Sequence, residues 1–356
     1  MAHSLLTTVI GSFPKPGYLP IEDWFDAARN EGAMNSERVT ENFTKYQENT
    51  KESDEQLFIK AAEEVISLQI NSGIDIPTDG EVRRENYVHY HCRYLSGFDF
   101  KNLERRVFRD GAYDSHLPAI RKKIEHTNVG YAAHDYISSQ KVSPVPIKFT
   151  LPGPLTIMDT TADCYYDDRP KLNRDLADTI NKEILRLVEA GCRYIQVDEP
   201  LFARQVNDAS SFGMEGIERC FHGVPKDVTK IMHMCCGYPD HLDDEDYKKA
   251  DPGSYHQLAR EVDDLNIDEV SIEDAHCQNN LNLLEKFEKK SVIFGAVAIA
   301  SSRIETEDEI INRINSALNH IDRNRLVIAP DCGLGLLTPE LAVAKLSVMC
   351  SAVKKV

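Results

Sequence analysis

The sequence predicts an α/β fold centred on a parallel sheet, and the expected architecture is an eight-stranded (β/α)8 TIM barrel. Eight short apolar runs alternate along the 356 residues with stretches of helical periodicity. Several runs are continuously apolar, as expected for parallel strands that are covered on both faces. The alternative is a doubly wound open sheet, although no glycine-rich dinucleotide fingerprint follows any run.

The predicted strands are short, and polar residues interrupt most of their C-terminal ends. In order they are "LLTTVIGSF" (5–13), "IDIPTDGE" (74–81), "VPIKFTLPGP" (145–154), "RYIQVDEP" (193–200), "KIMHMCCG" (230–237), "DEVSIEDA" (268–275), "SVIFGAVAI" (291–299) and "RLVIAPDCG" (325–333). The predicted helices are 54–73, 173–191, 254–266, 280–289, 306–321 and 339–355. Two of them end at glycine, as helices often do.

We expect residues 1–356 to form a single domain, because no repeat, low-complexity tract or linker divides the chain. Residues 82–144 do not follow the alternation of strands and helices. This segment is rich in Arg, Tyr and His. It is interpreted as an irregular excursion between the second and third strands, with a hairpin of its own.

The composition argues against several classes of partner and location. The net charge of −17 is opposite in sign to that of a typical nucleic-acid or anionic-membrane binder. No apolar run is long enough to cross a membrane, and the N-terminus lacks the features of a signal peptide. The nine cysteines are odd in number and scattered, which is not a disulfide framework. We therefore expect a cytoplasmic protein that binds small molecules.

Residues able to carry chemistry gather where the predicted strands end. In a barrel of parallel strands these ends meet at one mouth, where active sites lie. The pairs found there are Asp79 and Glu81, Asp198 and Glu199, His233 and Cys235, Glu273 and Asp274, and Asp331 and Cys332.

His233, Cys235 and Cys332 are candidate zinc ligands, because imidazole and thiolate groups suit this metal. Glu273, from the strand between them, could add an oxygen that an incoming group displaces. An exchangeable fourth position is typical of a catalytic rather than a structural zinc. The alternative is that these residues are buried cysteines and a hydrogen-bonded histidine with no metal.

Three other cysteines are not assigned to this site. Cys236 is expected to face away from His233, since neighbouring residues of a strand point to opposite faces. Cys277 and Cys92 are substitutes if the ligand set is different.

Zinc held by two thiolates and a carboxylate carries little net positive charge. It would be a modest Lewis acid, but it would keep a third, substrate thiolate deprotonated and nucleophilic near neutral pH. The reaction class indicated is alkyl transfer to a thiol, and hydrolysis by zinc hydroxide is the competing class.

Seven motifs resemble, in order, those of the catalytic domain of cobalamin-independent methionine synthase. They are "TTVIGSFP", "TDGE", "LPGPLTI", "IQVDEP", "HMCC", "VSIEDA" and "PDCGL". The resemblance runs from about residue 7 to the C-terminus and covers a single barrel, as in relatives such as epoxyalkane:coenzyme M transferase. It implies zinc bound by His233, Cys235, Glu273 and Cys332. It also implies contacts to a thiol substrate from Ile10, Ser12, Glu81 and Asp198.

The chain departs from the family's pattern in two places. Ala298 and Ala300 stand where the family carries the Asp and His of a "DIHS" stretch, whose His is linked to protonation of the folate. The stretch after "GPLTI" lacks the Trp expected to stack on the pterin, and Trp24 is the only Trp in the chain. The acid and the stacking group for methylfolate are therefore missing from their expected positions, and no catalytic acid is assigned.

Other side chains could act on a different donor. A sulfonium donor leaves as a neutral thioether and needs no acid, whereas an epoxide needs a proton donor. His89 and His91, which share a face if the segment is a strand, and Tyr165 and Tyr166 could supply one, although structural roles are favoured for all four. Arg303 could bind an anion or face solvent.

Three hypotheses follow. The first is a zinc-dependent thiol methyltransferase with homocysteine as the default acceptor. The second is an epoxyalkane:coenzyme M transferase-like alkyltransferase or lyase. The third is a zinc- or thiol-binding barrel without enzymatic activity.

Overall fold

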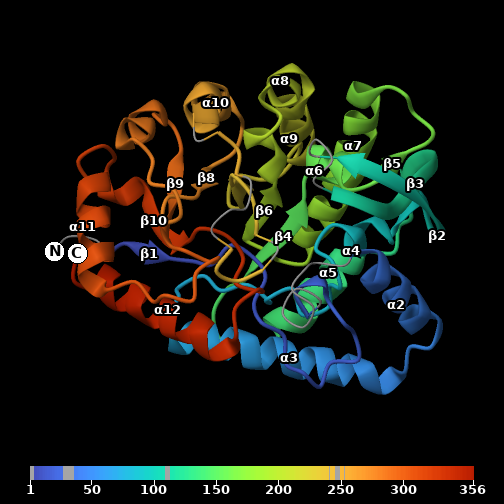
Figure 1. The fold of residues 1–356 in the computed structure, drawn as a ribbon, viewed down its shortest axis with the longest axis horizontal. Coiled ribbons are helices and arrows are strands. Elements are labelled where there is room, and N and C mark those ends of the chain that lie inside the picture. The colour runs from blue at the N-terminus through green and yellow to red at the C-terminus, as the bar shows by residue number, and fades with distance from the viewer. Residues whose placement is uncertain (1–3, 27–35, 109–112, 240, 245–248, 252) are drawn as a thin grey trace.

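A curled sheet of seven parallel strands forms the centre of the molecule (Figure 1). The computed structural model describes residues 4–26, 36–108, 113–239, 241–244, 249–251 and 253–356. The strands are β1 (Leu6–Thr7), β4 (Lys148–Pro152), β6 (Tyr194–Asp198), β7 (Thr229–His233), β8 (Glu269–Ile272), β9 (Ser291–Val297) and β10 (Leu326–Pro330). Their order is β1-β10-β9-β8-β7-β6-β4, and every neighbouring pair is parallel. The predicted α/β fold with a parallel sheet is confirmed.

The predicted second strand, 74–81, is not a regular strand. Ile76 forms one parallel bridge with Thr8, and Thr78 forms another with Lys148. These bridges place the segment between β1 and β4, the two edges of the seven-stranded sheet.

The sequence of this segment explains why the ladder is so short. Pro77 has no N–H to donate to a neighbouring strand. The chain then turns at Gly80 and Glu81, whose φ angles are 67° and 58°. This left-handed conformation is uncommon for a residue other than glycine, and such strain is often found at functional sites.

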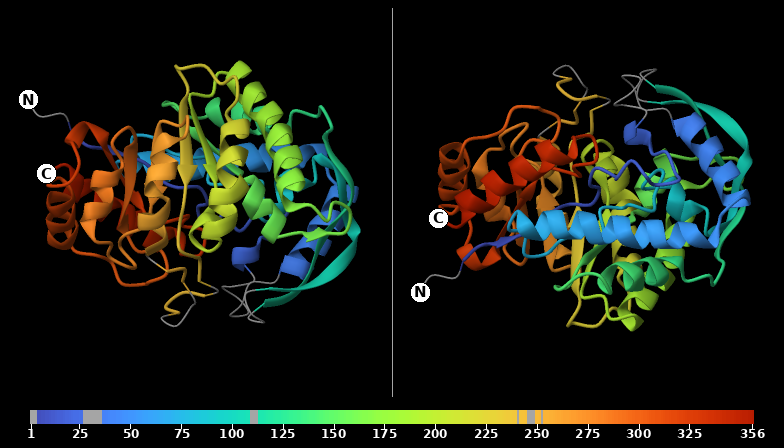
Figure 2. Two further views of the ribbon diagram at one scale, coloured as in Figure 1. Left: turned by 90° about the horizontal axis from the view of Figure 1, so that it is seen from above. Right: turned by 90° about the horizontal axis from the view of Figure 1, so that it is seen from below.

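Helices cover the outside of the curled sheet (Figures 1 and 2). Five follow the predicted stretches closely: α3 (Glu52–Asn71), α7 (Arg169–Glu189), α10 (Gly253–Asp264), α11 (Glu307–Ala317) and α12 (Pro339–Val353). The predicted helix 280–289 is wrong in type, because only a short 3₁₀ helix, η3 (Leu281–Lys286), forms there. The remaining short elements are α6 (Pro154–Asp159), η1 (Pro200–Ala203), α8 (Val206–Asp208), the π-helical η2 (Ala209–Gly213), α9 (Met214–Cys220) and η4 (Arg323–Arg325).

The excursion at 82–144 contains the expected hairpin, at the far end of the molecule from α11 (Figure 1). The hairpin is antiparallel and pairs β2 (Leu95–Phe108) with β3 (Tyr113–His126), and the short β5 (Ala162–Asp163) extends it. The segment also holds α4 (His89–Cys92) and α5 (Tyr131–Gln140), and α2 (Ser36–Glu48) packs on the hairpin. His89 and His91 therefore lie on a helical turn rather than on a strand.

Two hydrophobic clusters fill the two sides of the sheet. The larger one joins the sheet to its helices. The smaller one brings Ile231 of β7 together with residues of β9 and β10, which are not neighbours of β7 in the sheet, so it lies inside the curl. It consists of Ile10, Ile231, Ile293, Val327 and Ala329. This inner packing holds the strands at the spacing that brings their C-terminal ends together.

Candidate metal centre

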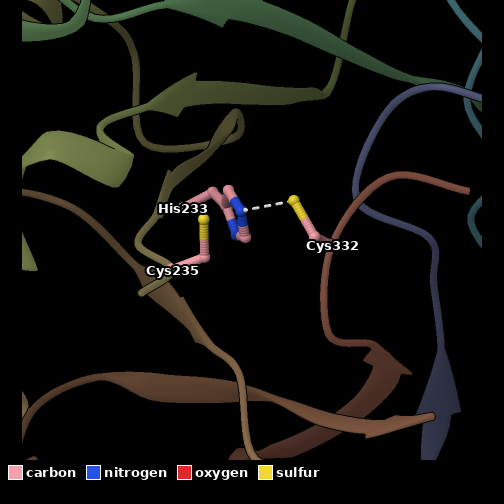
Figure 3. Close-up of side chains that lie close together, drawn as sticks. All are labelled: His233, Cys235 and Cys332. Atoms are coloured by element: carbon pink, nitrogen blue, oxygen red, sulfur yellow. Dashed lines mark hydrogen bonds between the residues drawn. The ribbon is translucent and has the colours of Figure 1, made fainter. Parts of the chain in front are cut away.

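Three of the four predicted zinc ligands converge at the C-terminal ends of β7 and β10 (Figure 3). One ligand atom each from His233, Cys235 and Cys332 lies within 4.8 Å of the others. The Cys332 Sγ lies 3.5 Å from the His233 Nε2. We call these residues the His–Cys–Cys cluster. Within the described part of the chain, this is the group of His, Cys, Asp and Glu side chains whose ligand atoms lie close enough together to hold a metal ion.

The histidine ring is held in place from behind. Its Nδ1 lies 3.0 Å from the Ser271 Oγ on the neighbouring strand β8. This contact leaves Nε2 directed at the two sulfurs, which is how metal-binding histidines are commonly oriented.

The electrostatics of the cluster favour a thiolate. The hydrogen bond with Cys332 and the adjacent His233 lower the pKa of Cys235 well below its usual value, against the opposing effect of burial. The same hydrogen bond, with burial, raises the pKa of Cys332 well above its usual value. Burial lowers the pKa of His233, but the bond to Cys235 and its charge outweigh burial and raise it. Cys235 is thus favoured as a thiolate beside a protonated Cys332 thiol, and a bound cation would favour ionisation of both thiols.

Glu273, the fourth predicted ligand, does not join the cluster. Its Oε1 accepts a hydrogen bond from the Lys249 Nζ at 2.7 Å, and its Oε2 accepts one from the Cys236 N–H at 3.1 Å. The Glu273 side chain is 2% exposed. Lys249 belongs to the loop after β7 and carried no signal in the sequence that marked it as a site residue.

The other cysteines lie apart from the cluster. The side chain of Cys236 packs in the larger hydrophobic cluster, between the sheet and its helices. This agrees with the expectation that it faces away from His233. Cys92 is buried in the same core, and Cys277 is half-buried in the loop after β8. All nine cysteines, each within the described residues, are free thiols.

The four predicted thiol-binding residues lie on the strand ends around the mouth. Asp198 is the register partner of His233, and its Oδ1 accepts a hydrogen bond from the Gln196 Nε2 at 2.7 Å. Burial, with Glu81 nearby and His233 opposing, raises the pKa of Asp198 to about 7. The Glu81 Oε1 accepts bonds from Arg84 at 3.0 Å and Thr150 at 2.8 Å.

Ser12 and Ile10 contribute mainly backbone and packing. The Ser12 Oγ accepts a 3.3 Å bond from the Gly335 N–H, and a Cβ on Gly333 would come within 2.3 Å of that Oγ. The side chain of Ile10 belongs to the inner hydrophobic cluster, and its carbonyl oxygen accepts a bond from Gln196.

Several strand-end carboxylates hold loops instead of pointing at a ligand. Glu199 accepts bonds from the Leu155 N–H, the Thr156 N–H and the Thr156 hydroxyl, at 2.8–3.0 Å, and so caps α6. Only glycine fits at 153, because a Cβ there would lie 2.3 Å from the Glu199 carboxyl. The "GP" and "DEP" motifs are therefore one structural unit.

Asp331 has a similar role next to Cys332. Its carboxylate accepts the N–H groups of Asp274, Ala275 and His276 at 2.7–2.9 Å. These bonds tie the loop after β8 to the loop that carries Cys332, and they fix the position of its sulfur.

Aromatic residues that carried no individual prediction lie beside the cluster. The pKa of Tyr87 is raised well above its usual value, by burial and then by Asp198 and the two sulfurs, which places its hydroxyl near them. The Trp24 ring lies 5.5 Å from that of Tyr87. The Tyr238 hydroxyl donates a 2.9 Å bond to the Gly333 carbonyl. Trp24, distant in sequence, is thus close to the site in space.

The other candidate proton donors have structural partners. His89 lies 3.2 Å from the Thr40 hydroxyl and 2.9 Å from the Thr160 carbonyl. The His91 Nδ1 contacts the Tyr131 hydroxyl at 2.8 Å. Tyr166 donates to Asp175, whereas Tyr165 is 52% exposed.

A different histidine lies at the stretch where the family carries its acid. The His276 Nε2 accepts bonds from the Ile299 and Ala300 N–H groups at 3.0 and 2.9 Å. Burial and nearby lysines lower its pKa to about 3, so this imidazole is neutral and is poorly suited to donate a proton. Arg303 forms a surface pair with Glu309.

Comparison with known proteins gives the family. The model of the catalytic domain of cobalamin-independent synthase matches residues 5–355. The chain belongs to this family. A methionine synthase of Saccharolobus solfataricus is 30% identical over 99% of this chain and 95% of its own. A solved B12-independent methionine synthase from a Shewanella species, in complex with selenomethionine, is 26% identical with a TM-score of 0.82, covering 99% of this chain and 98% of that one. A second solved structure, from Listeria monocytogenes, has a TM-score of 0.71 at 19% identity over 100% of this chain and 98% of its own, and it supports the fold.

The family assignment favours methyl transfer among the predicted reactions, because these relatives are methionine synthases. It makes the chain an enzyme of methyltransferase type and gives no support to epoxide chemistry. No helix in the described ranges is both long and apolar enough to pass through a bilayer.

Proposed function

We propose that this protein is a zinc-dependent thiol methyltransferase that uses homocysteine as its acceptor. The observation that carries the proposal is the convergence of His233, Cys235 and Cys332 within 4.8 Å at the mouth of the sheet. Two thiolates and an imidazole are a donor set that suits zinc. The two bridges at Ile76 and Thr78 support the further proposal that this segment completes an eight-stranded barrel around the site.

Each group of the chain has a role in this proposal. The bound metal would supply the charge that keeps the acceptor thiol ionised. Ser271 keeps the imidazole turned towards the metal, and Asp331 fixes the loop of Cys332. Asp198 and Glu81 would bind the amino group of an amino-acid thiol, while Ser12 and nearby N–H groups would bind its carboxylate.

The identity of the acceptor has support from a relative. The Shewanella neighbour was solved with selenomethionine, a selenium analogue of methionine. Methionine is the product of methyl transfer to homocysteine. We propose a cytoplasmic location, which fits the nine free thiols.

The residues around Ala298 and Ala300 do not identify the methyl donor. A donor that leaves without protonation suits this site, since His276 there is neutral and bound to backbone N–H groups. Purified zinc-loaded protein should be incubated with homocysteine and a panel of donors that includes methylfolate and a sulfonium, and methionine should be measured by mass. Methionine from at least one donor is expected, and none from any donor would overturn the proposal.

A further inference from the structure

A row of aromatic side chains lies beside the His–Cys–Cys cluster, and we call it the aromatic row; it consists of Tyr87, Trp24, Phe25 and Tyr238. We infer that the aromatic row binds the methyl donor, and that this donor carries its methyl group on a positively charged sulfonium sulfur. The inference rests on the proposed thiol methyltransferase function and names the chemical class of its donor.

The four rings form a continuous surface. The centroid of the Trp24 ring lies 5.5 Å from those of Tyr87 and Phe25, and the Phe25 ring lies 5.5 Å from that of Tyr238. The planes of neighbouring rings are inclined by 41–60°. Phe25 is buried, whereas the other three residues are half-buried. A bound molecule can therefore contact part of the aromatic row.

The aromatic row ends next to the sulfurs. The Tyr238 hydroxyl donates a 2.9 Å bond to the carbonyl of Gly333, the residue that follows Cys332. At the other end of the row, burial and then the nearby Asp198 and the two sulfurs raise the pKa of the Tyr87 hydroxyl. A molecule that lies on the row can therefore present a methyl group to a thiol held at the cluster.

The backbone holds the aromatic row in place without a ligand. The Trp24 N–H donates a 3.0 Å bond to the Glu85 carbonyl, which joins Trp24 to the segment that carries Tyr87. Only glycine fits at 335, because a Cβ there would come within 2.4 Å of the Phe25 ring. The rings are thus positioned before a donor binds, which lowers the entropic cost of binding.

The charges around the aromatic row favour a cationic ligand, because the faces of aromatic rings attract cations. Two cysteine thiolates and an acceptor thiolate outweigh the two positive charges of zinc, and Asp198 lies beside His233. Among the described residues, Lys and Arg side chains lie over other rings, as Arg84 does over Phe149, and none covers the ring of Trp24. A cationic donor can take that place.

A sulfonium also suits the reaction. The acceptor thiolate attacks the methyl carbon, a new S–C bond forms, and the S–C bond of the donor breaks with its electron pair left on the donor sulfur. The donor leaves as a neutral thioether and needs no proton, which fits Ala300 and the neutral His276 at the position of the family's acid. Because the positive charge disappears during the transfer, the aromatic row assists donor binding rather than the chemical step.

Trp24 is the only Trp in the chain, so the intrinsic fluorescence of the protein reports on the aromatic row directly. Zinc-loaded protein is titrated with trimethylsulfonium and, as an uncharged probe of similar size, with tert-butanol. The cation should change the Trp emission in a saturable way at concentrations about tenfold lower than tert-butanol requires, a difference within the range of cation–π contacts.

Steady-state kinetics with homocysteine and two sulfonium donors, S-methylmethionine and S-adenosylmethionine, test the role of Trp24 in turnover. Trp24→Leu should raise the KM for the donor about tenfold and leave kcat and the KM for homocysteine within about twofold of the wild type. Trp24→Phe, which keeps a ring, should lose less. Tyr165→Leu is the matched control, because Tyr165 is 52% exposed and lies outside the aromatic row, and it should change nothing.

The outcomes separate this inference from the proposed function. An equal response to the two probes, an unchanged donor KM in Trp24→Leu, or an equal rise in the KM values of donor and homocysteine would overturn the role of the aromatic row. Methionine formed from an uncharged donor or from methylfolate, but from neither sulfonium, would overturn the inference and leave the proposed function standing. Methionine from no donor would overturn both.

Thermal melting checks that each variant folds. If Trp24→Leu does not fold, Tyr87→Leu carries the same kinetic comparison, and the fluorescence titration needs only the wild-type protein.

Discussion

At the scale of single residues, the sequence indicates which side chains reach the mouth but not what each one contacts. The sequence alone predicts that His233, Cys235 and Cys332 lie together, because all three stand at the ends of predicted strands. The contacts of the Glu273 carboxylate could not be predicted in this way. Its partner Lys249 lies in a loop, and no strand pattern or motif marks that loop in the sequence. Tyr87 was missed for the same reason, since only the fold brings it beside Asp198.

Replacing Cys332 with Ser tests the ligand assignment. The variant should lose zinc, with an affinity drop larger than the roughly 10- to 100-fold loss typical of residues that only support a ligand. Metal analysis after dialysis would measure this. The matched control is Cys236→Ser, whose side chain lies in the core, and a Cys332→Ser protein that retains full zinc would contradict the assignment.

Ser271→Ala tests the orientation of the histidine. The change removes the hydroxyl that lies 3.0 Å from the His233 Nδ1. Zinc affinity should fall by about 10- to 100-fold, because the ring loses the partner that directs its Nε2. Chelator competition would measure it, and Ser291→Ala, at the start of β9, is the control.

At the scale of elements, apolar runs predicted the parallel strands well, because burial on both faces leaves a clear pattern. The pattern failed at 74–81, where Pro77 and the turn at Gly80 and Glu81 interrupt a segment that is otherwise strand-like. The helical pattern failed at 280–289, where only a 3₁₀ helix of 6 residues forms. The packing of α2 against the hairpin was not foreseen, because it depends on partners distant in sequence.

Gly153→Ala tests the unit formed by α6 and Glu199. A Cβ at 153 would lie 2.3 Å from the Glu199 carboxyl, so the cap of α6 must move. Unfolding free energy should fall by about 1–3 kcal/mol, the usual cost of overpacking. Urea unfolding would measure it, and Gly17→Ala, which meets open space, should change little. Equal effects in the two variants would contradict the account.

At the scale of the whole molecule, the inner face of the sheet carries an unusual charge. Lys148 is fully buried, and its Nζ has no hydrogen-bond partner among the described residues. Burial lowers its pKa to about 8, with Glu269 and Asp198 opposing. Buried charges are usually paired through hydrogen bonds, whereas Lys148 has only the more distant carboxylates of Glu269 and Asp198 to offset its charge.

This lysine should make stability depend on pH. Between about pH 8 and 10.5 the unfolded chain binds the lysine proton more than the folded chain does, so the lysine's contribution to stability rises with pH in that window. Lys148→Met should remove that rise and stabilise the protein at pH 7 by roughly 3 kcal/mol, from about 1.4 kcal/mol per pKa unit. Urea unfolding at several pH values would measure it, and identical pH profiles would contradict it.

Metal removal should also act on the whole molecule. Zinc binds the folded chain through groups that converge only after folding, so it should stabilise the protein by about 2.7 kcal/mol at a free concentration 100 times its Kd. The melting temperature should fall on chelation and recover when zinc is returned. A melting temperature that chelation leaves unchanged would contradict a site that joins β7 to β10.

Zinc K-edge absorption spectroscopy, with and without homocysteine, tests the central claim most directly. The account predicts two sulfur ligands in the resting protein, from Cys235 and Cys332, and a third when homocysteine binds. The Cys332→Ser variant should show one sulfur fewer in each state. A wild-type spectrum that is unchanged by homocysteine would contradict a catalytic thiol site and would indicate a closed structural zinc.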